Sequence, residues 1–214
     1  MSLRRTYRVF CLGAALPIGF ALGAHGCSAE TTLECVGEDC DLVCPEGEPG
    51  CDATCSNSAT CDVECADGEC NLGCGSQSEC NFDCSTSGNC TASCEAQSTC
   101  NVDCSDATNC NMDCAGGSEC NVECVENCGG ACAGNSNCNL TCDTGCGFSC
   151  TGNTNCTLSC STNCFICCQG SGECSLDCGP DEEVTECEGG IKVCGRDCPA
   201  ASECPADPTA TAEP

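Results

Sequence analysis

Cysteine recurs along most of the chain in a fixed five-residue unit. Each unit consists of a cysteine, a second residue that is most often Asn or Asp, an apolar third residue, a variable fourth residue and a second cysteine. A short polar loop leads to the next unit. Self-similarity at so short a period is typical of solenoids and repeat arrays. Fifteen copies begin at Cys40, Cys51, Cys61, Cys70, Cys80, Cys90, Cys100, Cys110, Cys120, Cys128, Cys138, Cys146, Cys156, Cys164 and Cys174.

The alternation inside the unit predicts a β-strand. The third position is apolar in most copies, as at Val102, Met112 and Val122, whereas the second and fourth positions are mostly polar. A period of two places the cysteines and the apolar residue on one face and the polar residues on the other. The Gly, Ser, Asn and Asp residues of the loops disfavour helix. We therefore expect each unit to form one half-buried strand.

One strand per ten residues predicts an all-β, disulfide-rich fold, a narrow β-solenoid of about ten residues per coil. The chain has 38 cysteines in 214 residues and no Trp, so covalent cross-links replace much of a packed core. An alternative is a string of disulfide-tied loops without a continuous sheet. In outline the spacing resembles the disulfide-stapled β-solenoids of insect antifreeze proteins, which also carry C-x5-C in each coil. Their Thr-x-Thr rows are absent here, so the resemblance implies no ice binding.

The spacing also restricts the disulfide pairing. The two cysteines of one extended unit lie about 13 Å apart, whereas a disulfide needs Cα atoms within about 4.4–6.8 Å. Pairing across the loop, from a second cysteine to the next first cysteine, satisfies that distance, and so does a ladder between equivalent cysteines of adjacent coils. Loop pairing leaves Cys167 and Cys194 over, and these two could pair with each other. The loop-paired candidates are Cys84–Cys90, Cys94–Cys100, Cys104–Cys110 and Cys114–Cys120.

The N-terminal segment has the features of an export signal. Three arginines precede an apolar run at residues 9–24, and Gly26 then precedes Cys27. This arrangement resembles the lipobox of bacterial lipoproteins, although Ala24 stands where that family carries Leu. The resemblance implies a signal peptide at residues 1–26 and lipid on Cys27; an ordinary signal peptide cut nearby is the alternative. Without Cys11 and Cys27, 36 cysteines remain, an even number that suits an oxidising compartment.

The expected organisation follows from these segments. Residues 1–26 form the signal peptide, 27–34 a lipidated tether, 35–178 the repeat array, 179–204 an interruption and C-terminal cap, and 205–214 a disordered tail. Ser28 is not the Asp that retains bacterial lipoproteins at the inner membrane, so the resemblance implies the outer membrane. A secreted or periplasmic protein is the alternative location.

Charge limits the partners of the exported chain. After residue 27 only Lys192 and Arg196 oppose 33 acidic residues, a net charge of −31. Nucleic-acid binding needs cations and is excluded. Carboxylates at repeat spacing offer oxygen ligands for low-affinity calcium binding, although a solvated charged face is the simpler interpretation. The candidate ligands are Asp83, Asp103, Asp113 and Glu123.

The residue inventory argues against catalysis. The single His is His25, inside the signal segment, so triads that depend on His are excluded. We expect no enzyme and no resident cofactor apart from weakly held calcium. Two function classes remain: a rigid structural or adhesive surface lipoprotein whose partner is unknown, anchored to the membrane by its N-terminal lipid, or a binding module for a carbohydrate, a divalent cation or a protein. The scarcity of aromatic residues favours the first class.

Overall fold

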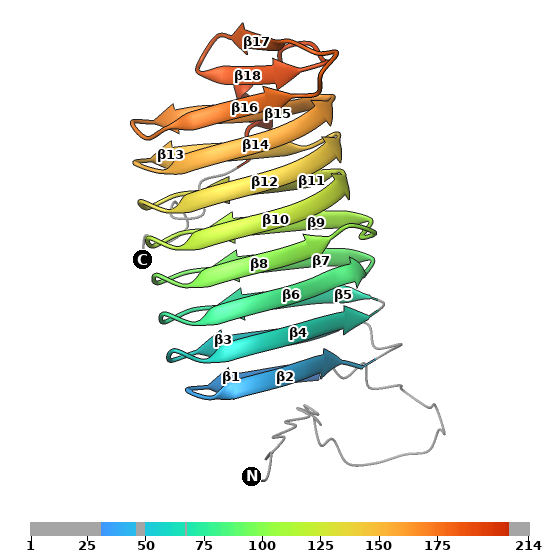
Figure 1. Ribbon diagram of the computed structural model, residues 1–214, viewed down its shortest axis with the longest axis vertical. Helices are drawn as coiled ribbons and strands as arrows, with labels where there is room; N and C mark the ends of the chain where they lie inside the picture. Colours follow the sequence, from blue (N-terminus) through green and yellow to red (C-terminus); the bar gives the residue numbers. More distant parts are fainter. Residues whose placement is uncertain (1–30, 46–49, 67, 206–214) are drawn as a thin grey trace, which may run out of the picture.

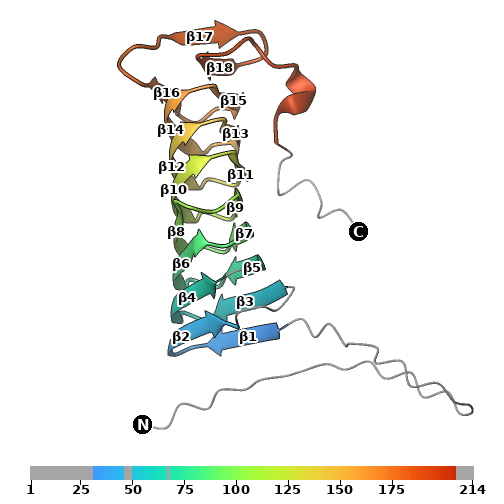
Figure 2. The same cartoon turned by 90° about the vertical axis from the view of Figure 1, so that its right-hand side faces the viewer.

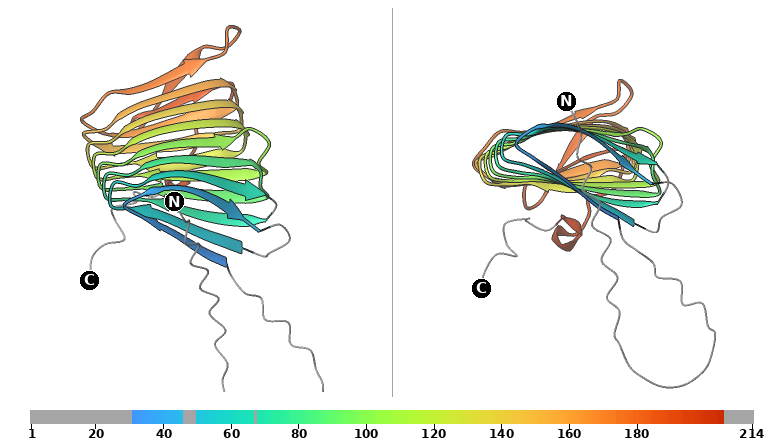
Figure 3. Two further views of the ribbon diagram at one scale, coloured as in Figure 1. Left: turned by 60° about the horizontal axis from the view of Figure 1, so that its bottom comes forward. Right: turned by 90° about the horizontal axis from the view of Figure 1, so that it is seen from below.

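The computed structural model describes residues 31–45, 50–66 and 68–205 of the chain. The expected signal peptide, Cys27 and residues 206–214 of the expected tail lie outside the described residues. The described chain winds into a rod made of two facing β-sheets (Figure 1). Seen from one end, the coil is flattened, with the two sheets lying face to face (Figure 3).

Up to β16, the odd-numbered strands and the even-numbered strands form separate sheets, called sheet A and sheet B. Sheet A contains β1 (Thr31–Val36), β3 (Gly50–Ser56), β5 (Glu69–Cys74), β7 (Asn89–Cys94), β9 (Asn109–Cys114), β11 (Cys128–Cys132), β13 (Gly147–Gly152) and β15 (Cys164–Gly170). Sheet B contains β2 (Asp39–Cys44), β4 (Thr60–Ala66), β6 (Glu79–Thr86), β8 (Thr99–Cys104), β10 (Glu119–Glu126), β12 (Asn137–Thr144), β14 (Asn155–Thr162) and β16 (Cys174–Cys178). All neighbours within these two sets pair in parallel.

The predicted β-solenoid is confirmed, and each of its roughly eight turns takes about 19 residues. One turn therefore uses two sequence units, where about ten residues per coil had been expected. The reason is geometric: a strand and one tight loop only reverse the chain. A second strand and a second loop are needed before the chain returns beside its starting point and can pair in parallel. The continuous sheets exclude the string of separate loops within the described residues.

The core lies between the two sheets and is built from the inward positions of the units. Equivalent cysteines of neighbouring strands lie side by side along each sheet, as Cys80, Cys100 and Cys120 do in sheet B. The third positions fill the space between them, and Phe82 and Phe148 are each only 1% exposed. The predicted alternation of inward apolar and outward polar residues thus describes the strands.

Disulfides join the two sheets across the loops that connect consecutive strands. The structure links Cys84 to Cys90 with Cα atoms 6.1 Å apart, and Cys94 to Cys100 and Cys104 to Cys110 with Cα atoms 6.2 Å apart. It also links Cys114 to Cys120 at 6.3 Å. These are the pairs that loop pairing predicts. The ladder between equivalent cysteines of adjacent coils does not form among the described residues, and each bridge instead closes the turn between a strand of one sheet and a strand of the other.

The two edges of the rod differ in their turns. From Cys55 onward, every turn from sheet A to sheet B has five residues between its cysteines. The turns from sheet B to sheet A shrink to three residues at 125–127, 143–145 and 161–163, and each three-residue turn contains one residue with positive φ: Asn127, Gly145 and Asn163. All the shortened steps therefore lie on one edge, and the coil tightens toward the C-terminal end.

A different structure closes the C-terminal end. The strands β17 (Val184–Cys187) and β18 (Ile191–Cys194) pair with each other in antiparallel fashion, and β18 also runs antiparallel to β15. The short 3-10 helix Ala201–Glu203 lies on the side of the odd-numbered strands (Figure 2). Ile191 and Val193 pack with Cys167 in a second small apolar cluster. Residues 179–204 thus form the cap of the rod.

The disulfides of the cap differ from the expected pairing. Cys194 bonds to Cys178, and Cys167 bonds to Cys204, so the expected pair Cys167–Cys194 does not exist. Cys187 and Cys198 form the remaining bridge. The cause is the reversal at β18, because it breaks the parallel repeat and brings the segment around Cys204 back to the outer face of β15. At the other end, β1 begins at Thr31, within the range expected for the tether.

Candidate functional site

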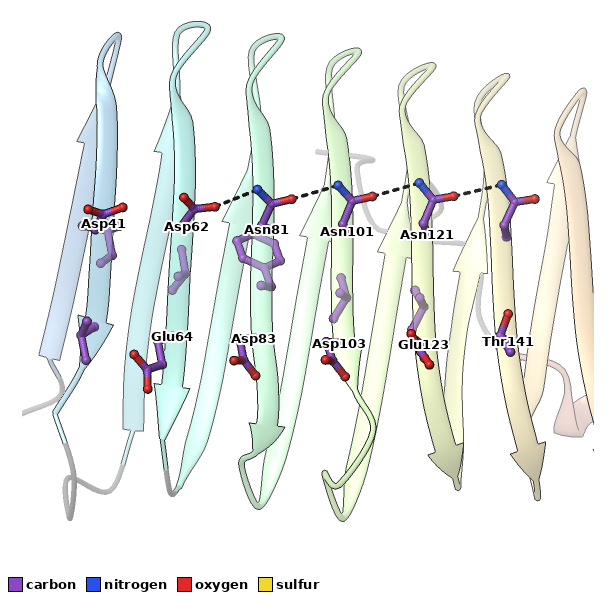
Figure 4. A pocket seen from close by; sticks show the side chains of 17 residues that line it. Asp41, Asp62, Glu64, Asn81, Asp83, Asn101, Asp103, Asn121, Glu123 and Thr141 are labelled. Carbon is purple, nitrogen blue, oxygen red and sulfur yellow. Dashed lines mark hydrogen bonds between the residues drawn. The ribbon is translucent and has the colours of Figure 1, made fainter.

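The outward residues of sheet B form two straight rows along the rod. Parallel in-register pairing places the second position of each unit beside the second position of the next, and likewise for the fourth. Figure 4 shows both rows on successive strands. The first row contains Asp41, Asp62, Asn81, Asn101, Asn121 and Asn139, and the second contains Val43, Glu64, Asp83, Asp103, Glu123 and Thr141.

The first row is a hydrogen-bonded amide ladder. Asn81 Nδ2 donates to Asp62 Oδ1 at 2.7 Å, and Asn101 Nδ2 donates to Asn81 Oδ1 at 2.9 Å. The same bond joins Asn121 to Asn101 and Asn139 to Asn121, each at 3.0 Å. All four donors point toward the N-terminal end of the rod. A carboxylate only accepts hydrogen bonds, so Asp62 fits the accepting end of this ladder.

The second row is acidic. Glu64, Asp83, Asp103 and Glu123 face one another across neighbouring strands, which lie about 4.8 Å apart. Two of these carboxylates are also tied to their own turns. Asp83 Oδ1 accepts from the Ser85 backbone N–H at 3.1 Å, and Asp103 Oδ1 accepts from the Ser105 backbone N–H at 3.0 Å. These bonds fix the directions of the two side chains and use only one oxygen of each carboxylate, Oδ1.

The sequence placed four carboxylates in one set, and the structure divides them. Asp83, Asp103 and Glu123 lie on sheet B, whereas Asp113 lies on β9 of sheet A. Consecutive units alternate between the sheets, so a residue one unit away is on the opposite face of the rod. Glu64 belongs to the row and was missed. The expected calcium row of Asp83, Asp103, Asp113 and Glu123 is therefore wrong in one member, because Asp113 does not lie beside the other three. The row on sheet B consists of Glu64, Asp83, Asp103 and Glu123.

Asp113 has surroundings unlike those of the sheet B carboxylates. It is half-buried between Ser93 and Ala131 in the register of sheet A. Burial raises the pKa of this carboxyl above its ordinary value; a hydrogen bond from the Ala131 backbone opposes the rise, and the charge of Glu95 adds to it. Its environment therefore favours the neutral form more than exposure would.

A groove lies between the two rows of sheet B. It has a volume of about 750 Å³ and runs from Asp41 to Thr141. Its walls carry six carboxylates, and no Lys or Arg lines it. The arrangement offers amide and carboxylate groups at a constant spacing to a cation or to an extended ligand. The carboxylate groups are those of Asp41, Asp62, Glu64, Asp83, Asp103 and Glu123.

The cysteines offer no thiolate among the described residues. The sulfur atoms of Cys84, Cys90 and Cys104 lie close enough together to suggest a metal site, but each of these cysteines is in a disulfide. A disulfide sulfur lacks the negative charge with which thiolates bind zinc or copper. The buried sulfur clusters are therefore stacked cross-links.

Sequence reasoning found the outward rows but missed their alternation between faces. A signal for it existed in the loop lengths, because the three-residue loops occur only at every second junction. Among the described residues, the aromatic side chains form no exposed cluster that could serve as a second binding face. Phe82 and Phe148 are buried, and the half-buried Phe165 lies beneath the Arg196 guanidinium, 4.7 Å from the ring centre.

No protein-family model, no curated protein and no solved structure matches this chain. Within residues 31–45, 50–66 and 68–205, the structure contains no helix with the length and hydrophobicity needed to cross a bilayer.

Proposed function

We propose that the protein is an exported, non-catalytic rod that is anchored to the bacterial outer membrane by lipid on Cys27 and serves a structural or adhesive role at the cell surface. The observation that carries this proposal is the disulfide pattern. The 36 cysteines of residues 35–204 pair with one another in 18 disulfides. None of them is left as a partner for Cys27, which suits a cysteine that carries lipid.

The build of the rod supports a mechanical role. A disulfide closes nearly every turn between the two sheets, and the core cysteines are buried; Cys80 and Cys104, for example, are 0% exposed. Covalent closure of each turn limits local opening, which proteases require. The chain beyond residue 25 also lacks His, the residue that serves most often as a general base. A rigid, protease-resistant spacer is the use that this chemistry favours.

Palmitate labelling tests the anchor. We expect cells that express the full chain to incorporate labelled palmitate into it and to retain the protein in the membrane fraction. The Cys27→Ala variant should lose both the label and the membrane association, whereas Ser28→Ala, which changes the neighbouring residue, should keep them. Absence of label from the unaltered chain, or full labelling of Cys27→Ala, would refute the lipid anchor.

A second candidate function is cation binding on sheet B. Like charges directly opposite on neighbouring strands destabilise a sheet, and a divalent cation between Asp83 and Asp103 would remove that repulsion. Calcium affinities of extracellular modules are about 10⁻⁴–10⁻³ M. We expect calorimetric titration with Ca²⁺ to show binding in this range and Asp103→Asn to weaken it. Asp113→Asn, on the opposite sheet, is the matched control. Absence of binding heat in the unaltered protein would exclude this candidate.

A further inference from the structure

The two ends of the rod differ in their distance from Cys27 along the chain. The strand β1 pairs with β3 on one side only and lies at one end, and the cap lies at the other (Figure 2). Three residues separate Cys27 from Thr31. Even fully extended, they place Thr31 within about 14 Å of the Cys27 Cα atom. A lipid on Cys27 therefore holds the first coil close to the bilayer.

The long faces of the rod carry negative charge without compensation. Sheet B has its acidic row, and sheet A presents Asp52, Glu69 and Asp113. No Lys or Arg occurs anywhere between residues 31 and 178. Laying either face on an anionic bilayer would bring these carboxylates within a Debye length of the lipid charge, about 8 Å at physiological ionic strength. Contact through a long face is therefore repulsive.

The cap does not draw the far end toward the membrane. Its two cations are half-buried, and both are engaged by neighbouring groups. Lys192 Nζ donates to the Cys174 carbonyl oxygen at 2.9 Å, and the Arg196 guanidinium lies 3.5 Å from a Glu203 carboxylate oxygen and over the Phe165 ring. Their surroundings are also acidic, since Glu182, Glu183 and three further acids lie between residues 181 and 188. The far end thus has no free basic patch for anionic lipid.

We propose that the rod stands upright on an anionic bilayer, with the coil of β1 and β2 facing the lipid headgroups and the cap displayed outward. This inference depends on the proposed lipidation of Cys27. The short tether keeps the first coil at the surface, and repulsion of the acidic long faces prevents the rod from lying down. The eight strands of sheet B, at about 4.8 Å each, place the cap about 34 Å farther from the bilayer than the first coil.

Energy transfer from two single-lysine proteins measures this orientation. Lys192 is the only lysine of the chain, so Lys192→Arg gives a lysine-free background. Asp39→Lys then adds a dye site on the first coil, and Glu188→Lys adds one on the cap; both positions are exposed, and both changes alter the charge equally. The palmitoylated proteins are labelled with an amine-reactive donor and bound to phosphatidylglycerol–phosphatidylethanolamine vesicles that contain an acceptor lipid. The background protein corrects for other amines.

We expect transfer from the dye on residue 39 to be several-fold more efficient than transfer from the dye on residue 188. Equal transfer from the two labelled proteins would overturn the upright orientation while leaving the anchor intact. A chain that carries no palmitate would overturn both proposals, so the two failures are distinguishable. In 1 M salt the Debye length falls to about 3 Å, and the difference between the two dyes should narrow. A difference that is unchanged in 1 M salt would overturn the electrostatic cause.

Discussion

At the scale of single residues, Gly130 shows how tightly the coils stack. It occupies the apolar third position of its unit, between Met112 and Phe148 in the register of sheet A. A Cβ at residue 130 would overlap the carbonyl oxygen of Met112, and the backbone has φ of +154°. The two large buried neighbours and the close backbone leave space for hydrogen alone. The exception to the apolar pattern thus has a steric cause.

Gly130→Ala should therefore destabilise the rod. Overpacking a well-packed site costs about 1–3 kcal/mol, and here the obstacle is backbone that cannot rotate away. We expect a fall of this size in the free energy of unfolding, measured by guanidinium titration with the disulfides intact. Gly75→Ala is the matched control, since a Cβ there meets no atom within 4 Å. Equal stability of the two variants would show that β9 and β11 are farther apart than described.

Asp113 makes stability depend on pH. Its raised pKa, caused first by burial, means that folding favours the protonated form. The stabilising effect of protonation is fully present below the unfolded pKa of about 3.9 and is lost as the pH rises through the higher folded pKa. We expect Asp113→Asn to raise the melting temperature at pH 7 and to have little effect near pH 3. Glu69→Gln, at an exposed position of sheet A, serves as the control. A variant equally stabilised at both pH values would contradict the assigned cause.

At the scale of the strand, the direction of the amide ladder explains where Asp and Asn occur. An Asn in the ladder donates toward the N-terminal end and accepts from the C-terminal side, whereas an Asp can only accept. Asp62 accepts from Asn81 on sheet B, and Asp52 accepts from Asn71 at 3.0 Å on sheet A. In both sheets the carboxylate precedes the amide. The choice between two residues of nearly equal shape is thus made by hydrogen-bond direction.

Asn101→Asp tests the ladder with an almost isosteric change. At neutral pH the variant cannot donate to Asn81 Oδ1, and it places a charge beside the acidic row. One lost hydrogen bond costs about 0.5–1.5 kcal/mol, so we expect a loss of that order in unfolding free energy. Below about pH 4 the protonated side chain can donate again, and the loss should shrink.

Asn111→Asp provides the comparison for the ladder. Asn111 is exposed at the equivalent position of sheet A, and the described residues give it no side-chain hydrogen bond of this kind. Its replacement should cost less than that of Asn101 at neutral pH. Equal losses in the two variants, or a loss at residue 101 that does not depend on pH, would argue against a contribution from the ladder.

The strands were predictable because their cause is local. Alternation within five residues specifies which side of Val102 or Met112 is buried, and a chain of that length is too extended to bridge its own cysteines. The number of units per turn has a nonlocal cause, because it depends on how the chain returns to its start. The sequence therefore indicated the outward position of Asp113 but not the face on which it lies, and the candidate row had to be redrawn with Glu64.

At the scale of the whole molecule, the array and the cap are cross-linked in different ways. The array bridges span short turns, as Cys104–Cys110 does with a separation of six residues, whereas Cys167–Cys204 spans 37. The spacing around Cys194 imitates another repeat unit, and this similarity led to the wrong partner for Cys167. Only the antiparallel return of β18 distinguishes the cap, and nothing in the cysteine spacing specifies that direction.

The difference in cross-linking predicts a sequence of reduction. Thiol–disulfide exchange requires access of the attacking thiolate to a sulfur. Cys198 is exposed and Cys187 half-buried, whereas Cys104 and Cys110 are 0% and 3% exposed. We expect limited dithiothreitol, followed by alkylation and peptide mapping, to modify Cys187 and Cys198 first while the β-sheet circular dichroism persists. The array bridge should react at least about tenfold more slowly, since an opening free energy of only about 1.4 kcal/mol gives that factor. Simultaneous alkylation of residues 104 and 187 would mean that the rod and its cap open as one cooperative unit.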